Sequence, residues 1–104
     1  MAIEHDIQNQ IRAALADDCI LFRINVGKGT TYDGRHFDTG APKGYSDLSG
    51  HRIGDGRAVY IEVKAPGGRV RPEQKNFIEQ MRSTGAIAGI CHSAEEALDL
   101  IHGL

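Results

Sequence analysis

The segment from Ala58 to Ala65 constrains the fold more than any other part of the chain. Apolar side chains occupy every second position and alternate with an aromatic, an acidic and a basic one: Val59, Ile61 and Val63 alternate with Tyr60, Glu62 and Lys64. Because successive side chains of a strand point to opposite faces, this pattern predicts a β-strand with one apolar face. Two interpretations of the other face are open. Either solvent covers it, or it presents Glu62 and Lys64 in a functional site.

Patterns before this segment predict a helix, two strands and a long loop. Apolar residues recur at every fourth position from Ile3 to Leu15, which is typical of an amphipathic helix. Strands are predicted over Ile20–Val26, with a mostly buried start, and over Tyr45–Ile53. The polar, glycine-rich stretch Gly27–Gly44 is predicted to be a long loop, of the kind that is often functional. A hairpin turn is expected at Gly54-Asp55-Gly56, where Asp-Gly can adopt positive φ angles.

Patterns after the segment predict a helix, a short buried strand and a last helix. Pro66-Gly67-Gly68 ends the strand, Pro72 suits the first position of a helix, and Gly85 suits its end. The apolar face of this helix consists of Phe77, Ile78 and Met81. Ala86–Cys91 is predicted to be a buried strand, and Ser93 with Glu96 forms a capping box that opens the last helix.

The element order is therefore α-β-β-β-α-β-α, which indicates an α/β domain with a small central mixed sheet flanked by helices. A chain of 104 residues buries one modest core, so residues 1–104 are expected to form a single domain. Its 40% hydrophobic and 25% charged residues argue against a disordered chain. The sequence has no apolar stretch long enough for a membrane span and no secretory signal pattern. Two cysteines without framework spacing predict buried thiols and a cytoplasmic protein.

The charge distribution argues against one kind of nucleic-acid binding and leaves another open. A net charge of −2 argues against a protein that coats DNA by neutralising phosphates alone. Basic residues are nevertheless concentrated around the segment and in the long loop, namely Lys64, Arg69, Arg71 and Lys75, and Lys28, Arg35 and Lys43. They can contact phosphates or can simply form a solvated face.

Asp47 is expected to join Glu62 and Lys64. A turn centred near Asp55 places Asp47 opposite Val63 or Lys64, within one residue of register, so the three side chains can cluster at one end of a hairpin. Two neighbouring carboxylates repel each other unless a cation lies between them, and hard oxygen ligands suit Mg²⁺ or Mn²⁺. A lysine beside them can hold or deprotonate a water, or neutralise charge on a phosphate. This set fits metal-assisted phosphodiester hydrolysis.

Glu4 and Gln74 break the patterns of their helices, and each has two interpretations. Glu4 lies seven residues before Ile11 and so at the edge of the apolar stripe, facing inward. It is also simply an acid in a first turn, where the helix dipole favours it. Gln74 opens the apolar series of its helix, where it can satisfy free backbone groups or contact a ligand.

These residues also resemble a known family. The runs Gly44-Tyr45-Ser46-Asp47-Leu48, Ile61-Glu62-Val63-Lys64, Gly68-Arg69 and Glu73-Gln74 resemble the virus-type replication-repair nuclease (VRR-NUC) domain of the PD-(D/E)xK superfamily. Glu4-His5-Asp6-Ile7 and the run from Phe22 to Gly27 are similar to the family's first helix and strand, so the resemblance covers nearly the whole chain.

The resemblance implies a restriction-endonuclease-like αβββαβ core and a metal-dependent DNA endonuclease. Asp47, Glu62 and the carbonyl of Val63 would bind Mg²⁺ or Mn²⁺, and Lys64 would be the catalytic lysine. Glu4 and Gln74 would be the family's helix-borne acid and glutamine. Stand-alone members are implied to be homodimers from phages and bacteria that cut branched DNA such as four-way (Holliday) junctions in DNA repair, in the cytoplasm of a bacterial or phage-infected cell.

Two residues depart from the family pattern. Ser46 stands where the superfamily has proline, and Arg71 stands where a helix-capping Ser or Thr is usual, which leaves the helix cap in doubt. Two other functions remain open, a non-catalytic nucleic-acid-binding or dimerisation module and a sequence-specific restriction-type nuclease. The retention of Asp47, Glu62 and Lys64 argues against the first, and the shortness of the chain against the second.

Overall fold

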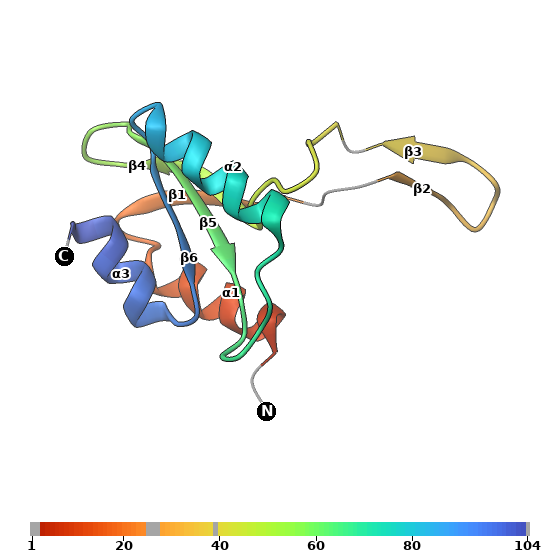
Figure 1. Cartoon of the computed structure of the whole chain (residues 1–104). Helices are drawn as coiled ribbons and strands as arrows, with labels where there is room; N and C mark the ends of the chain where they lie inside the picture. Colours follow the sequence, from red (N-terminus) through yellow and green to blue (C-terminus); the bar gives the residue numbers. More distant parts are fainter. Residues whose placement is uncertain (1–2, 25–27, 39, 104) are drawn as a thin grey trace.

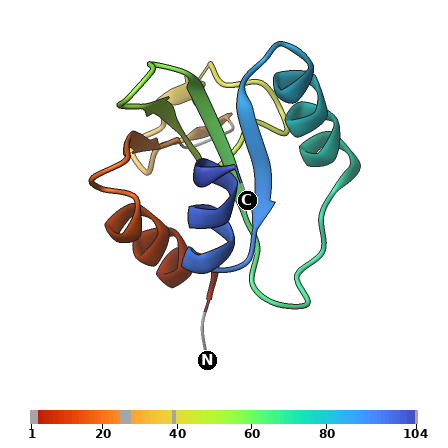
Figure 2. The same cartoon turned by 90° about the vertical axis from the view of Figure 1, so that its left-hand side faces the viewer.

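A computed structural model describes residues 3–24, 28–38 and 40–103 and contains a four-stranded sheet between helices (Figures 1 and 2). The sheet has the order β1-β4-β5-β6, in which β5 and β6 are parallel and the other neighbours antiparallel. Its strands are β1 (Cys19–Arg23), β4 (Leu48–Arg52), β5 (Ala58–Val63) and β6 (Ile87–Cys91). The helices are α1 (Glu4–Ala14), α2 (Pro72–Ser83) and α3 (Ala94–His102). The predicted order and the small mixed sheet are confirmed.

Helices α1 and α3 cover one face of the sheet, and α2 covers the other (Figure 2). Because the apolar residues of α1 are spaced four residues apart, Ile7, Ile11 and Leu15 are all buried against this face. Val59 and Ile61 of β5 lie beneath them. Ile3 is exposed, because it precedes the first turn of the helix. The first apolar layer of the core therefore lies between β5 and these two helices.

A second apolar cluster lies between the sheet and α2. The ring of Phe77 contacts those of Tyr45 and Tyr60, with ring centroids 4.8 and 5.6 Å apart. Strand β5 is thus covered on both faces, and Glu62 and Lys64 are only 2% and 6% exposed. The interpretation that solvent covers the polar face of this strand is wrong, because β5 lies inside the sheet and α2 packs over it.

Strand β1 differs from its prediction because it is the edge strand. It begins at Cys19, and its expected buried start is wrong, since Ile20 and Phe22 are 44% and 60% exposed. Helix α2 packs on β5 and β6 and leaves this part of the sheet uncovered. The predicted continuation of the strand through Asn25 and Val26 lies outside the described residues.

The predicted long loop contains an additional hairpin. Strands β2 (Lys28–Thr30) and β3 (His36–Asp38) pair with each other and form a separate two-stranded sheet that projects from the body (Figure 1). We call residues 28–38 the arm. The sequence pattern missed it because none of the described side chains of the arm is buried, so the segment has no apolar alternation to indicate strands.

The turn between β4 and β5 is longer than the predicted Gly54-Asp55-Gly56 turn. It spans residues 53–57, and Gly56 is its only residue with a positive φ, of 70°. Asp55 instead accepts hydrogen bonds from the Arg52 side chain, at 2.6 and 3.1 Å. The strand predicted from Tyr45 begins at Leu48, so the residues before it form a loop.

The ends of the last two helices follow their sequence signals with one exception. Helix α2 begins at Pro72 as predicted. Ser93 Oγ accepts a hydrogen bond from the Glu96 amide at 3.1 Å, but the Glu96 carboxylate accepts from the His92 amide rather than from Ser93. The predicted capping box is therefore only half formed. Both cysteines are buried free thiols, as expected, and none of the described helices has the length and apolar character that a membrane span requires.

The second cluster yields a stability prediction. Phe77→Ala removes the ring that joins α2 to both tyrosines, and we expect it to lower the free energy of unfolding by about 3–5 kcal/mol. Asn76→Ala, at an exposed position of the same helix, is the control and is expected to change it by less than about 0.5 kcal/mol. Urea denaturation of both variants checks the difference. Equal midpoints for Phe77→Ala and the wild type would contradict this packing.

Candidate active site

The sheet register brings Asp47 to Glu62. Leu48 pairs with Ile61, so Asp47 lies across from Glu62, one residue before the register expected from the turn. The Asp47 carboxylate accepts a hydrogen bond from the Val63 amide at 2.8 Å. This bond holds Asp47, in the loop just before β4, against the end of β5.

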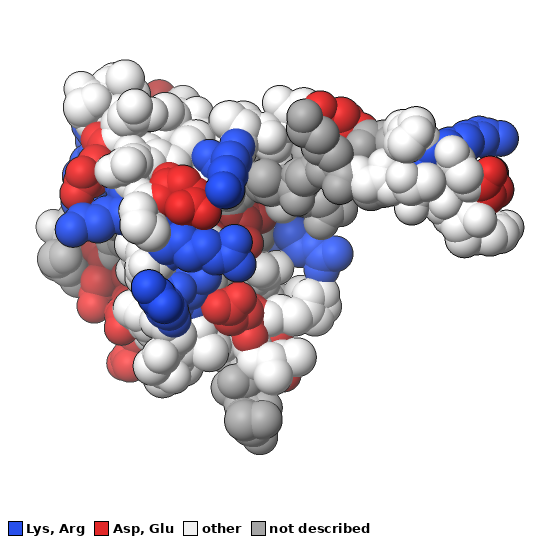
Figure 3. Space-filling view, turned by 45° about the vertical axis from the view of Figure 1, so that its right-hand side comes forward, with Lys and Arg blue, Asp and Glu red and all other residues white. Residues whose placement is uncertain are grey.

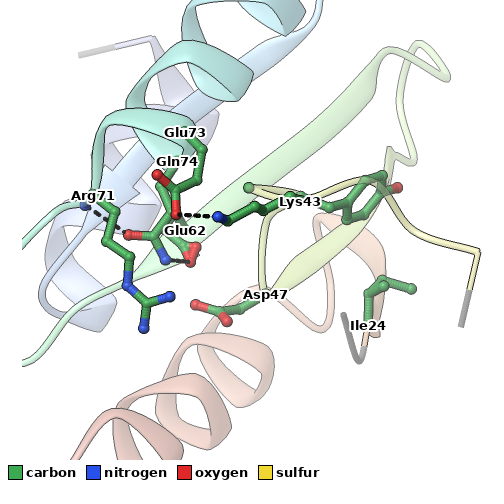
Figure 4. A pocket seen from close by; sticks show the side chains of 9 residues that line it. Ile24, Lys43, Asp47, Glu62, Arg71, Glu73 and Gln74 are labelled. Carbon is green, nitrogen blue, oxygen red and sulfur yellow. Dashed lines mark hydrogen bonds and ion pairs between the residues drawn. The ribbon is translucent and has the colours of Figure 1, made fainter. Parts of the chain in front are cut away.

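Asp47 and Glu62 border a pocket of about 330 Å³ between the end of β5, the start of α2 and the loop before β4 (Figure 4). The residues that line it are Ile24, Lys43, Gly44, Tyr45, Asp47, Glu62, Arg71, Glu73 and Gln74. Acidic, basic and amide groups thus converge on one cavity.

The pKa of Glu62 is strongly raised. Its burial and, next, the charge of Asp47 raise its pKa to about 9, while Lys64 opposes the shift. Its Oε1 accepts a hydrogen bond from Gln74 at 3.2 Å, and its Oε2 is buried without a hydrogen-bond partner among the described residues. A buried carboxylate oxygen without a partner is costly unless a proton or a cation satisfies it.

Gln74 satisfies a free backbone group, as one of its two interpretations predicts, and also contacts Glu62. Its side-chain oxygen accepts a hydrogen bond from the Arg71 amide at 3.0 Å, and its amide nitrogen donates to Glu62 (Figure 4). The doubt about the helix cap is thereby answered, because Gln74 satisfies the backbone amide of Arg71 itself. The same side chain fixes the orientation of the Glu62 carboxylate.

Lys64 extends past the end of β5 and meets α1. Its ammonium nitrogen lies 3.7 Å from a carboxylate oxygen of Glu4, whose side chain is 45% exposed. Glu4 therefore points toward the site, as its inward interpretation predicts, although it contacts the lysine rather than the acid pair. Because the Lys64 side chain is almost fully buried, the charge of Glu4 offsets part of its desolvation.

The basic residues predicted to contact nucleic acid separate into two groups. Lys43 and Arg71 line the pocket, and the Lys43 ammonium lies 4.0 Å from a Glu73 carboxylate oxygen. The others lie outside the pocket: Arg69 and Lys75 are exposed, Arg35 lies on the arm, and the side chain of Lys28 is outside the described part. Figure 3 shows basic and acidic side chains intermixed on one face of the body.

Four lining residues were not predicted as site residues, namely Ile24, Gly44, Tyr45 and Glu73. Glu73 appears in the sequence analysis only within the matched run, although its place beside Gln74 in the first turn of α2 was a usable signal. Gly44 also belongs to a matched run, but its role comes from a contact distant in sequence. It has a φ of 89°, and a Cβ atom there would lie 2.3 Å from the carbonyl oxygen of Glu73.

Gly44→Ala tests this close approach. We expect the methyl group to push the loop away from α2, which displaces Asp47 and lowers the unfolding free energy by more than about 1 kcal/mol. Gly54→Ala is a matched control, because nothing lies within 4 Å of the place that its methyl group would take and its φ is not positive. Thermal melting of both variants measures the effect, and equal melting temperatures would contradict the tight contact.

The acid pair fits a divalent cation of the hard type. Among residues 3–24, 28–38 and 40–103, no group of three or more His, Cys, Asp and Glu side chains could enclose an ion. Two carboxylates facing a pocket, one with a buried unpartnered oxygen, nevertheless offer the oxygen donors that Mg²⁺ and Mn²⁺ prefer. Mg²⁺ in particular is often held by one or two carboxylates, with water and phosphate completing its shell.

The raised pKa of Glu62 predicts how the metal-free protein responds to pH. The folded state keeps a proton on Glu62 up to about pH 9, whereas the unfolded chain loses it near its ordinary value of 4.5. In EDTA, the free energy of unfolding should therefore fall as the pH rises from about 5 to 9. Because one pKa unit equals about 1.4 kcal/mol, the melting temperature should fall by several degrees or more. Glu62→Gln should flatten this dependence, and an equally steep slope in that variant would contradict the assignment.

The four-stranded mixed sheet and its two flanking helix layers are compatible with the restriction-endonuclease-like fold. The sequence profile of the VRR-NUC domain matches residues 35–95. This match covers more than half of the chain, which therefore belongs to the VRR-NUC family of nuclease domains. It includes Asp47, Glu62, Lys64 and Gln74 and leaves Glu4 outside. No curated protein sequence matched the chain significantly.

Proposed function

We propose that this protein is a Mg²⁺- or Mn²⁺-dependent endonuclease that hydrolyses DNA phosphodiester bonds and prefers branched DNA such as four-way junctions. The observation that carries the proposal is the unpartnered Glu62 oxygen, buried beside Asp47 at the pocket that both acids line. Family membership supplies the nuclease class, and this chemistry supplies the reason for a metal.

In this proposal Asp47, Glu62 and the Val63 carbonyl would hold the ion. When bound, it would polarise the phosphate and lower the pKa of a bound water. The Val63 amide keeps Asp47 in place, and Gln74 holds one oxygen of Glu62 so that the other remains available. These contacts prepare both acids before the substrate arrives.

Lys64 and the pocket cations would act on the substrate. The Lys64 ammonium, held beside Glu4, would orient the attacking water and neutralise the charge that develops on the phosphate. Lys43 and Arg71 line the same pocket and would contact phosphates on either side of the cut. Arg35, Arg69, Lys75 and Lys28 would add weaker phosphate contacts outside it.

We also propose that the protein works as a homodimer. Paired cuts in a symmetric junction require two sites related by a twofold axis, and one short chain has little surface to hold a branched duplex. Sedimentation should show a dimer, and a stable monomer that still cuts junctions symmetrically would contradict this.

Cleavage of labelled duplex, single-stranded, flapped and four-way-junction DNA tests the proposal. We expect cutting in Mg²⁺ or Mn²⁺ but not in EDTA, with the highest rate on a branched substrate. A wild-type protein that binds these DNAs but cuts none of them in either metal would overturn it in favour of a binding module.

A further inference from the structure

The arm rises from the border of the pocket. The chain leaves the body after Ile24 and returns through residues 40–47, and pocket-lining residues lie on both sides of the arm in sequence, namely Ile24 before it and Lys43, Gly44, Tyr45 and Asp47 after it. Figures 1 and 3 show the arm extending away from the body. If a nucleic-acid strand were bound in the pocket, its neighbouring segment would therefore lie beside the arm.

No described element of the chain packs over the arm. It pairs with no strand of the main sheet, and the described side chains from Thr30 to His36 are all exposed. A two-stranded hairpin alone is only marginally stable in water. Contacts with a partner would therefore stabilise it.

Polar groups at the tip of the arm stabilise its turn, and the side chain of Tyr32 takes no part in these contacts. The Thr31 hydroxyl donates to the Asp33 carboxylate and accepts from the Arg35 amide at 3.1 Å. The Arg35 guanidinium lies 3.4 Å from the same carboxylate. Tyr32, between these residues, is fully exposed. Its ring has no packing role within the described protein.

The charge of the arm favours contact with bases over contact with phosphates. Lys28 and Arg35 balance Asp33 and Asp38, so the arm is neutral when His36 is neutral. A neutral arm gains little from the phosphate backbone, whereas an exposed aromatic ring can stack on any unpaired base. In plain duplex DNA the bases are already stacked, but branches and flaps contain bases that are free to stack elsewhere.

We propose that the arm lies along the DNA held in the pocket and that Tyr32 stacks on an unpaired base at a branch point. This inference rests on the proposed nuclease function and names the feature of the substrate that the protein recognises. It makes Tyr32 a specificity-determining residue, distant from the acid pair.

Binding in EDTA tests the inference without cleavage. Fluorescence anisotropy would compare wild type, Tyr32→Ala and Tyr32→Phe on a flapped DNA and on a matched duplex. We expect Tyr32→Ala to lower the preference for the flap by roughly 10-fold and Tyr32→Phe to restore it, because stacking needs only the ring. The salt dependence should keep its slope in Tyr32→Ala, since no phosphate contact is lost, whereas Arg71→Ala should lower the slope by about one.

A fluorescent base supplies a second readout. With 2-aminopurine at the branch point, wild type and Tyr32→Phe should quench its emission by stacking, and Tyr32→Ala should not. Equal flap preference and equal quenching in all three proteins would overturn the inference. A Tyr32→Ala variant that sediments as a monomer while the wild type is a dimer would also overturn it, because the arm would then contact a second copy.

Failure of this inference can be told apart from failure of the proposed function. If the wild type cuts DNA in Mn²⁺ and Tyr32→Ala has the same flap preference, only the role of the arm is wrong. If the wild type cuts no DNA in either metal, the proposed nuclease function itself is wrong.

Discussion

Lys64→Ala should reduce the rate of metal-dependent DNA cleavage by about 10³-fold, because it removes the only buried cation that the structure describes beside the acid pair. A protonated lysine is not a metal ligand. The variant should therefore keep the increase in melting temperature that Mn²⁺ causes in the wild type. Loss of cutting with metal binding intact is the result that separates a catalytic cation from a structural one.

Two further variants make the Lys64 result interpretable. Lys64→Met keeps most of the buried side-chain volume and should be as inactive as Lys64→Ala, which excludes a cavity as the cause. Arg12→Ala removes an exposed positive charge from the other end of α1 and should cut at the wild-type rate. Wild-type cleavage by Lys64→Met would contradict the role given to this lysine.

Glu62→Gln should make the protein more stable without metal and inactive with it. The amide has nearly the shape of the carboxyl group and can still pair with Gln74, but it is neutral without taking up a proton and is a poor ligand. We expect the melting temperature in EDTA at pH 8 to rise by several degrees, the Mn²⁺-induced shift to disappear, and cleavage to fall by about 10³-fold.

In Glu62→Gln the melting temperature is expected to rise while the cleavage rate falls, and these opposite changes exclude misfolding as the cause of lost activity. A variant that lost activity by misfolding would melt at a lower temperature, not at a higher one. Glu79→Gln, at an exposed position of α2, is the matched control and should change neither property. A Glu62→Gln variant that retained the Mn²⁺-induced shift would show that the ion binds elsewhere.

Local patterns predicted those parts of the fold that depend on neighbouring residues. The fourfold spacing of α1, the alternation of β5 and the proline that opens α2 each specify an element within one short segment. The approximate meeting of Asp47 with the end of β5 was also predictable, because one turn sets the register of a hairpin. The residue that lies across from Asp47 is Glu62, because the length of that turn sets the register, and the Asp-Gly pair did not indicate this length.

Features that depend on tertiary packing were not predictable from one segment. The burial of Glu62 comes from α2 packing over β5, and the exposure of Phe22 comes from the place of β1 at the sheet edge. The contact of Gly44 with Glu73 joins residues that are distant in sequence. The arm had no apolar pattern to reveal it, since none of its described side chains is buried.

A Mn²⁺ titration followed by two readouts tests the central claim most directly. The initial rate of DNA cleavage and the melting temperature would be measured on the same wild-type samples, with EDTA reversal at the end. If Asp47 and Glu62 hold the catalytic ion, both quantities should rise at low Mn²⁺ concentrations, remain unchanged in Glu62→Gln, and return to baseline in EDTA. Cleavage that persists in EDTA, or that Glu62→Gln performs at the wild-type rate, would contradict the claim.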